Sequence, residues 1–273
     1  MTEINQTEKR YAIGEVSEIT GVNSVTLRAW QRRYGLIVPQ RTPKGHRLYT
    51  HDDIVKIRQI VSWLKKGVSI GKVKPLLETQ GQAREQATTE FHHELIDSMM
   101  AEVEKLDSHK LSKILLENMK IYPFDMLVNQ VLMPIHCRIA DTNNPLKGIQ
   151  SAFWQGVITQ CCNEVMVKAV KPKAPRCLLL SFDQSELIWI KALLLTYQGY
   201  AVTTLVSISD KLTGFQDALT ALPWKACVVV GENKLTTPQL QELIAVNQAF
   251  AFPMILAGSL RVIHANDFKT SEL

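Results

Sequence analysis

The first quarter of the chain alternates between apolar stripes and short breaks, a pattern that predicts a helix, a turn and a second helix. Apolar residues recur every three or four positions over 13–19, as on one face of a helix, and Gly21 then ends that helix. Asn23 and Ser24 are N-cap residue types for the second helix, which Gly35 closes.

A short hairpin is expected after the second helix. Pro39 favours an extended chain, and residues 41–49 can then turn back on themselves with Pro43-Lys44-Gly45 at the tip. Residues 51–67 have the spacing of another amphipathic helix, and one shorter helix follows it. Helix, turn, helix and hairpin in this order predict a winged helix-turn-helix, whose second helix enters a DNA groove.

The second helix and the hairpin supply the candidate contacts to DNA. We expect Val25 and Leu27 to face the core and Thr26 to face outward with the arginines. Arg28 is the strongest single candidate, because a forked guanidinium suits both base edges and phosphates. His46 has two open interpretations, a phosphate donor or a surface histidine without a role. The candidate DNA-binding residues are Ser24, Thr26, Arg28, Arg32, Arg33, Arg41, Lys44, His46, Arg47 and Tyr49.

The middle of the chain is helical in pattern from about Phe91 to Val170. Asp107 or Ser108 can cap the second of these helices, Pro123 suits the first turn of the third, and Pro134 is expected to kink it. Four helices joined by short loops predict a bundle. We place them near 91–105, 108–120, 123–140 and 147–170.

After a break at 171–175, the period changes to short apolar strands that alternate with helices. This alternation predicts a parallel, doubly wound α/β sheet of the flavodoxin-like kind. Ligands of such sheets bind beyond the carboxyl ends of the strands, where Gly231-Glu232-Asn233 follows the third strand. A tight strand-to-helix turn explains that tripeptide equally well. The expected strands are 176–182, 200–206, 225–232 and 252–258, with a short fifth over 261–265.

Positive charge is concentrated in the predicted winged region. Residues 11–78 hold 12 Lys and Arg against 5 Asp and Glu, whereas the segment from 79 onward holds 17 against 19. A polyanion partner would therefore be held by the first quarter of the chain, although a solvated basic face would have the same composition.

Hydropathy and cysteine usage favour a cytoplasmic protein. No apolar run approaches the ~18 residues of a membrane helix, and residues 1–10 lack the apolar stretch of a secretory signal. The five cysteines form no C-x-x-C pair, so buried reduced thiols are expected, with metal binding or redox sensing as the alternative. We predict no metal site.

A set of short motifs runs through the winged region at consistent spacing. They are Ile13-Gly14-Glu15-Val16, Thr26-Leu27-Arg28, Arg33-Tyr34-Gly35-Leu36, Pro39-Gln40-Arg41, Gly45-His46-Arg47-Leu48-Tyr49, Asp53-Ile54 and Gly67-Val68-Ser69. With these motifs, residues 11–78 closely resemble the DNA-binding domain of the MerR family of bacterial transcription regulators. The form of the second helix is similar to the MlrA-like subgroup, which is related to the cobalamin-binding regulators CarH and LitR. The resemblance implies a homodimer on a pseudo-palindromic promoter, RNA polymerase as a partner, and either activation by promoter distortion or simple repression.

The resemblance also makes cobalamin the obvious ligand to consider. The related regulators carry Asp/Glu-x-His-x-x-Gly after the first strand, but here Ser185 replaces the histidine and Ile188 replaces the glycine that follow Asp183. CarH and LitR are cobalamin-dependent photoreceptors that carry a second histidine, on the upper face of the cobalamin, and Val165 stands at that position here. Serine is a poor cobalt ligand, so we expect no cobalamin. Asp183 and Glu186 fit a helix capping box instead.

These observations divide the chain into six segments. They are a disordered tail (1–10), a MerR-type winged helix-turn-helix (11–79), a linker (80–90), a helical bundle like the cobalamin-binding cap (91–170), a flavodoxin-like α/β domain (175–265) and a second tail (266–273). The helix at 91–106 or the whole bundle could dimerise.

The sequence favours a transcription regulator over an enzyme. It has no nucleophile elbow, no phosphate-binding loop and no zinc-protease motif, so we assign no catalytic residues. We therefore expect a sequence-specific dimeric regulator, with activation favoured. A regulator that responds to a ligand or to light through its C-terminal module is the alternative, and a cobalamin-dependent enzyme is the least favoured.

Overall fold

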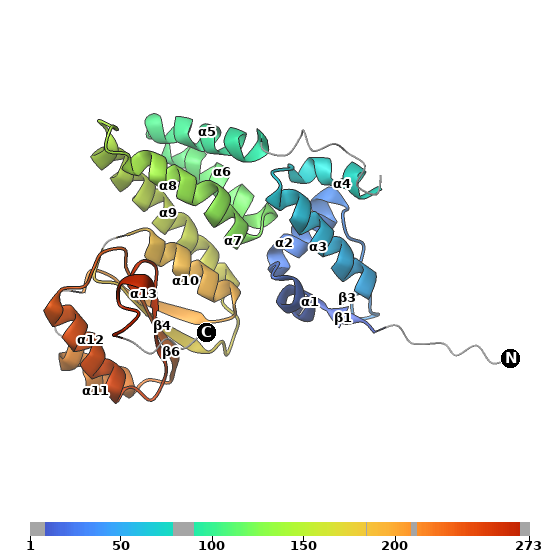
Figure 1. The fold of residues 1–273 in the computed structure, drawn as a ribbon. Coiled ribbons are helices and arrows are strands. Elements are labelled where there is room, and N and C mark those ends of the chain that lie inside the picture. Colours follow the sequence, from blue (N-terminus) through green and yellow to red (C-terminus); the bar gives the residue numbers. More distant parts are fainter. Residues whose placement is uncertain (1–8, 79–89, 184, 209–211, 268–273) are drawn as a thin grey trace. The chain divides into compact units, whose positions relative to one another are not determined.

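The computed structural model describes residues 9–78, 90–183, 185–208 and 212–267. The chain divides into two compact units, Met1–Ser151 and Ala152–Leu273, which are described separately below (Figure 1). The expected tails and the linker at 80–90 lie outside the described residues, apart from a few positions at their edges. The remaining domain boundaries stay predictions.

The first unit begins with the winged part, residues 11–78. Its three short strands form an antiparallel sheet in the order β1-β3-β2, and its helices follow the predicted order (Figure 1). The second helix is α-helical only at its start and then widens into a π-helical turn. The elements are β1 (Tyr11–Ala12), α1 (Ile13–Thr20), α2 (Ser24–Ala29), η1 (Trp30–Tyr34), β2 (Gln40–Arg41), β3 (Arg47–Tyr49), α3 (His51–Lys65) and α4 (Ile70–Glu78).

The predicted helix ends are confirmed. Gly21 follows α1 with φ +72° and Gly35 follows η1 with φ +57°, a left-handed conformation that costs glycine little. The Asn23 side chain accepts hydrogen bonds from the backbone N–H groups of Val25 and Thr26, which fixes the start of α2. The sequence signals therefore placed these boundaries correctly.

The predicted orientation of α2 is confirmed for Leu27 and wrong for Val25 and Thr26. Val25 is 42% exposed, whereas Thr26 is fully buried together with Leu27 and Trp30. In a helix that begins at Ser24, positions 27 and 30 follow position 26 by one and by four residues, so all three lie on the same side of the helix.

The remaining helices of the first unit lie close to the predicted helical segments. The predicted helix over 123–140 is divided by a π-helical turn that ends before Pro134. The Asp107 side chain accepts a hydrogen bond from the Lys110 N–H and so caps the helix that begins at Ser108. The elements are α5 (Glu90–Glu104), α6 (Ser108–Ile121), α7 (Phe124–Leu127), η3 (Val128–Leu132) and α8 (Met133–Ala140). A further helix, α9 (Lys147–Ala169), runs across the boundary between the units.

The second unit contains a parallel four-stranded sheet in the order β5-β4-β6-β7. Its central strands β4 and β6 are almost completely buried, as their continuous apolar sequences require. The elements are β4 (Arg176–Leu180), α10 (Leu187–Tyr197), β5 (Ala201–Leu205), η4 (Leu212–Phe215), α11 (Gln216–Thr220), β6 (Trp224–Val230), α12 (Thr237–Ala249) and β7 (Met254–Ala257).

The predicted fifth strand is wrong. Residues Leu260–Ile263 form a short helix, α13, whose Leu260 is 1% exposed and joins the core beside the sheet. In the described parts of the chain, no helix combines the length and the apolar character needed to cross a membrane.

Candidate nucleic-acid interface

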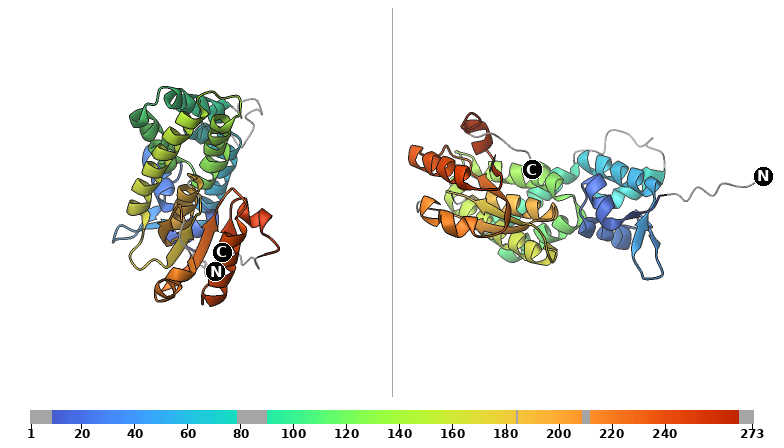
Figure 2. Two further views of the ribbon diagram at one scale, coloured as in Figure 1. Left: turned by 90° about the vertical axis from the view of Figure 1, so that its left-hand side faces the viewer. Right: turned by 90° about the horizontal axis from the view of Figure 1, so that it is seen from below.

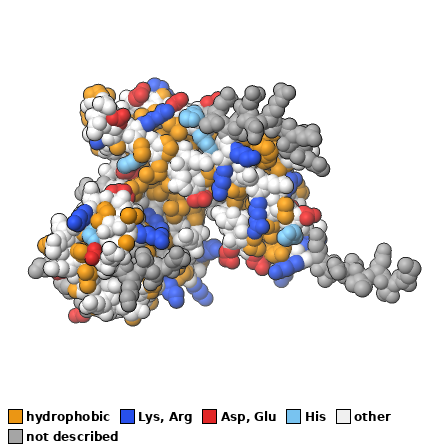
Figure 3. Space-filling view, in the orientation of Figure 1, with side chains coloured by type: hydrophobic (Ala, Val, Ile, Leu, Met, Phe, Trp, Pro, Cys, Tyr) orange, Lys and Arg blue, Asp and Glu red, His pale blue; other side chains and the backbone are white. Residues whose placement is uncertain are grey.

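The structure brings the predicted basic residues to the surface of the winged part. Figure 3 shows lysine and arginine side chains spread over the visible face of this part. Within the described residues, none of the candidate cations of the second helix and hairpin forms an ion pair with an acidic side chain. The exposed ones are Arg28, Arg32, Arg33, Arg41, Lys44 and His46, and Arg47 is half-buried.

The wing is a tight hairpin that projects from its neighbouring helices (Figure 2). The Thr42 N–H donates to the His46 carbonyl at 2.9 Å, and the Gly45 N–H donates to the Thr42 carbonyl at 2.8 Å. Gly45 has φ +82°, so a glycine is needed at the tip. Lys44 therefore lies at the exposed end of a backbone that is held in place.

Arg47 joins the wing to the second helix. Its Nε donates a hydrogen bond of 2.6 Å to the Gln31 Oε1 atom. In the antiparallel ladder, Arg47 is also directly opposite Arg41. Gln31 is not among the residues predicted from the sequence, because nothing in its spacing indicates a contact that depends on the tertiary fold.

Two candidate contacts are excluded from this surface by their burial. Thr26 and Tyr49 are both fully buried, so their side chains cannot reach DNA in this conformation. Burial raises the pKa of the Tyr49 phenol, although the nearby charges of Arg47 and Arg28 act in the opposite direction. Ser24 remains half-buried at the start of α2.

The inner side of the second helix is bonded to the end of α6 in the same unit. The Trp30 Nε1–H donates to the Ile121 carbonyl at 2.7 Å. The next residue, Tyr122, accepts a hydrogen bond from the Ile70 N–H through its hydroxyl oxygen, and Phe91 stacks on its ring. Burial raises the pKa of the Tyr122 phenol, as expected for a structural tyrosine.

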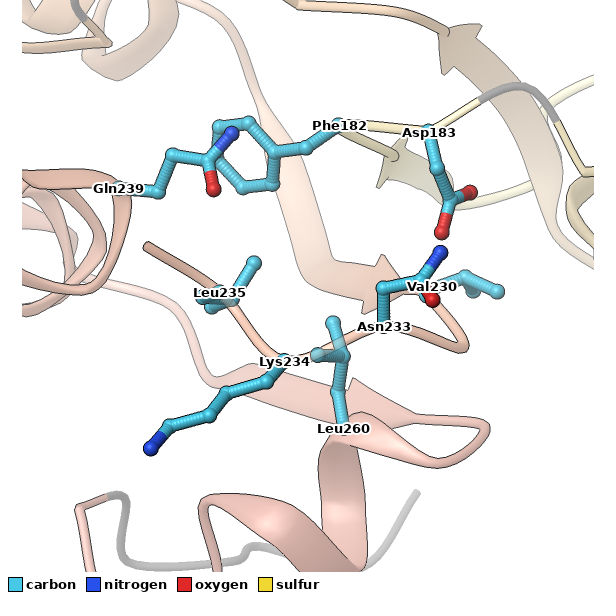
Figure 4. Close-up of a pocket in the computed structure, with 9 residues that line it drawn as sticks. Phe182, Asp183, Val230, Asn233, Lys234, Leu235, Gln239 and Leu260 are labelled. Atoms are coloured by element: carbon cyan, nitrogen blue, oxygen red, sulfur yellow. The ribbon is translucent and has the colours of Figure 1, made fainter. Parts of the chain in front are cut away.

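A second candidate site lies at the carboxyl edge of the parallel sheet. It is a cavity of about 120 Å³. Figure 4 shows the Asp183 carboxylate directed toward the loop that carries Asn233, with the Leu260 side chain directed into the same space. The lining residues are Phe182, Asp183, Val230, Gly231, Asn233, Lys234, Leu235, Gln239 and Leu260.

The polar groups at this edge are largely used to join its loops. Asp183 accepts hydrogen bonds from the Ser181 hydroxyl at 2.9 Å and from the Glu232 N–H at 3.2 Å. The Glu232 carboxylate in turn accepts from the Ser259 hydroxyl at 2.6 Å. The neighbouring Gly258 has φ +67°, and an added Cβ would lie 2.7 Å from a Glu232 oxygen.

The loop after β4 does not fit a histidine-ligated corrin. The Ser185 hydroxyl oxygen accepts a hydrogen bond from the Leu187 N–H, and Ile188 is fully buried in the core. The predicted capping box is wrong, because Asp183 is bonded to the neighbouring loops and α10 begins after Glu186 without a side-chain cap bond.

The thiols of the described residues are mostly buried. Cys161, Cys162, Cys177 and Cys227 are buried, whereas Cys137 is exposed. Burial raises the pKa of the Cys177 thiol to about 11 and raises the pKa of Cys162 and Cys227 as well. In the described ranges, no three His, Cys, Asp or Glu side chains are grouped closely enough to hold a metal ion.

Known proteins resemble this chain along most of its length. Residues 11–80 match the family described as MerR HTH family regulatory protein. The HTH-type transcriptional regulator MlrA of Salmonella typhimurium (strain SL1344) is 30% identical over 238 residues, which cover 86% of this chain and 93% of the relative. MlrA of Escherichia coli (strain K12) is 30% identical over 239 residues, covering 85% of this chain and 92% of that protein. The HTH-type transcriptional repressor CarH of Myxococcus xanthus is 30% identical over 143 residues, 49% of this chain and 48% of CarH.

These relatives are named as transcriptional regulators, not as enzymes. The matched residues 11–80 include the winged part, whose arginines on the second helix and the hairpin form no ion pair within the described residues. The chain belongs to the MerR family of helix-turn-helix transcriptional regulators.

Proposed function

We propose that this protein binds a promoter as a sequence-specific dimer and activates transcription by distorting the DNA for RNA polymerase. The observation that carries the proposal is the set of exposed cations on one helix and the adjoining hairpin, which form no ion pair within the described residues. Arginines on a helix followed by a basic wing suit a major groove and its flanking phosphates.

Within the second helix, Arg28, Arg32 and Arg33 would read bases or hold phosphates. The wing would supply Arg41, Lys44, His46 and Arg47 to the backbone. Thr26 and Tyr49 are omitted because they are buried, and Ser24 lies at the helix start, where it is only half-buried.

Dimerisation and polymerase contact belong to this proposal because they follow from the family resemblance. A MerR-type regulator uses two winged parts on a pseudo-palindromic site. A DNA site with two-fold symmetry requires two identical DNA-binding parts at a fixed spacing. The helix α5 or the other helices of the bundle are the elements that we assign to this contact.

We further propose that the C-terminal unit is a flavodoxin-like module related to cobalamin-binding domains, without histidine-ligated cobalamin. The strand order β5-β4-β6-β7 is the sequence order 2-1-3-4, which is typical of flavodoxin-like sheets. The bonded Ser185 and the buried Ile188 argue against a corrin at this edge.

A ligand-responsive repressor is the second candidate function. The cavity at the carboxyl edge of the sheet favours it, since this is where α/β sheets bind ligands. One relative, CarH, is named as a repressor. Under this alternative, a small molecule other than cobalamin would control the winged part.

The experiment that tests the main proposal has two stages. Bound fragments would first be selected from a genomic DNA library with the full-length protein, and the affinity for the selected duplex would then be measured. Arg28→Ala is expected to weaken that affinity by about 1–3 kcal/mol and to relax the preference at one base position.

The control variant is Arg261→Ala, which removes the same charge from an exposed arginine of α13. It should leave the affinity almost unchanged. Selection of no preferred sequence by the wild-type protein, or equal effects of the two variants, would overturn the assignment of the second helix as the reading element.

A further inference from the structure

The bond between Gln31 and Arg47 uses only one part of the guanidinium. The Gln31 amide oxygen accepts from Nε, at 2.6 Å, and Gln31 belongs to the π-helical turn of the second helix. The two terminal Nη groups of Arg47 have no hydrogen-bond or ion-pair partner among the described residues. A guanidinium held at Nε can still donate two parallel hydrogen bonds to one phosphate.

The surroundings of Arg47 are electropositive. Arg41 lies directly opposite in the β2–β3 ladder, an arrangement in which like charges destabilise a strand pair. Arg28 is close enough that its charge, like that of Arg47, acts on the Tyr49 phenol. Asp53 is the acidic group whose charge also acts on the Tyr49 phenol, and its carboxylate accepts the Thr50 N–H at 2.9 Å in a capping box at the start of α3.

Stability alone does not explain why an uncharged glutamine is bonded to Arg47 among several cations. A glutamate in place of Gln31 could accept the same Nε–H and would also neutralise one of three neighbouring cations. The amide instead fixes the direction of the guanidinium and leaves its full charge in place. Uncompensated charge at a surface is useful where a polyanion binds.

We propose that Gln31 is a positioning residue for DNA binding, which holds Arg47 at Nε so that its Nη groups bind a backbone phosphate with undiminished charge. This inference rests on the proposed DNA-binding function. Gln31 acts through Arg47 and does not itself contact a base. The bond between Gln31 and Arg47 also fixes the wing relative to the second helix, where both approach the duplex.

The test compares Gln31→Glu and Gln31→Leu with the wild-type full-length protein on the selected duplex and on an unrelated duplex, over a range of salt concentrations. Gln31→Glu retains the acceptor but adds a negative charge. It should melt no lower than the wild type, bind both duplexes roughly tenfold more weakly, and lower the salt slope by about one. Gln31→Leu should weaken binding to both duplexes similarly, because Arg47 is no longer held.

A double-mutant cycle separates positioning from direct contact. In an Arg47→Ala background, Gln31→Leu should cause no further loss of affinity, because its effect is transmitted through Arg47. A persistent loss in that background, or a loss confined to the selected duplex, would show that Gln31 contacts DNA itself. A lower melting temperature with unchanged affinity and salt slope would show a purely structural bond. Either result overturns the proposal.

The two proposals fail in different ways. If the wild-type protein selects no DNA, the proposed function fails. If the wild-type protein binds its selected duplex and Arg28→Ala weakens it, while both Gln31 variants bind as the wild type does, only the role of Gln31 is wrong.

Discussion

Thr26 is a polar side chain placed where the fold offers its hydroxyl no partner. It is fully buried, and its Oγ1 atom forms no hydrogen bond within the described structure. A buried hydroxyl without a partner is costly, and a methyl group of the same shape removes that cost. Thr26→Val should therefore raise the free energy of unfolding by about 1 kcal/mol and leave DNA affinity unchanged, as measured by urea unfolding and by titration of the selected duplex.

Thr20 provides the matched control for that substitution. Its hydroxyl donates to the Val16 carbonyl at 2.6 Å, so Thr20→Val should lower the free energy of unfolding by about 1 kcal/mol. A loss of stability in Thr26→Val would instead indicate a hidden partner, and a loss of DNA affinity would return Thr26 to the interface.

The cysteines differ sharply in accessibility. Cys137 is exposed, whereas the other four thiols are buried and three of them have a raised pKa. Thiolate is the reactive form, so a thiol reagent at pH 7.5 should modify Cys137 rapidly and the others only after denaturation. Mass spectrometry of digested protein would identify the site. Rapid labelling of Cys177 or Cys227 in the folded protein would contradict the buried sheet.

For single residues, the position was predictable where the chemistry of the side chain determines it. Arginines and lysines remain at the surface because burying an unpaired charge is expensive. The predicted positions of Thr26 and Val25 were wrong, since a shift of one residue turns a helical side chain by about 100°. The bond between Gln31 and Arg47 joins elements 16 positions apart, so no local pattern could reveal it.

Among the secondary-structure elements, the second helix of the winged part ends at a residue whose backbone conformation favours glycine. Gly35 has φ +57°, a conformation that costs residues with a Cβ about 1–2 kcal/mol. An added Cβ would meet only Lys74 Nζ at 3.9 Å, so space is not the obstacle. Gly35→Ala should therefore destabilise the protein by about 1–2 kcal/mol through the backbone alone, as measured by thermal or chemical unfolding.

Gly14→Ala is the control for that prediction. Gly14 lies within α1 at negative φ, and its added Cβ would meet nothing within 4 Å. Alanine is the better helix former, so this variant should be neutral or stabilising by up to about 1 kcal/mol. Equal effects of the two substitutions would show that φ at Gly35 does not limit stability.

Element boundaries were predictable wherever a cap or a breaker marks them. Gly21, Asn23 and Asp107 all have the predicted structural roles. The segment 260–263 was misassigned because a short apolar run suits a strand and a buried helix equally well. The π-helical turns at η1 and η3 have no sequence signature that separates them from an α-helix.

For the whole protein, the decisive question about the C-terminal unit is whether it takes up a corrin. The Ser185 hydroxyl oxygen is already bonded to the Leu187 N–H, and serine is a poor cobalt ligand. After incubation with adenosylcobalamin or methylcobalamin in the dark and desalting, the protein should show only its own absorbance. A retained cobalamin spectrum near one per chain would overturn this prediction.

The order of a winged part, a helical segment and a parallel sheet was predictable from the changing period of apolar residues. The first compact unit extends to Ser151, so it contains the winged part and the helices that follow it, whereas the expected domain boundaries near residues 80 and 90 stay predictions. Contacts between helices distant in sequence determine such units, and single-chain periodicity carries no information about them.

The hydrogen bond from Trp30 to the Ile121 carbonyl limits how this protein can be divided. A fragment ending near residue 80 would contain every candidate DNA contact, yet it would leave a large indole without its acceptor and without the end of α6 beside it. Such a fragment would be prone to aggregate, and fusing it to another sensor would not preserve its native packing. The smallest fragment that keeps the native packing of the winged part therefore includes the helices that follow it, through Tyr122, whose hydroxyl accepts from the Ile70 N–H.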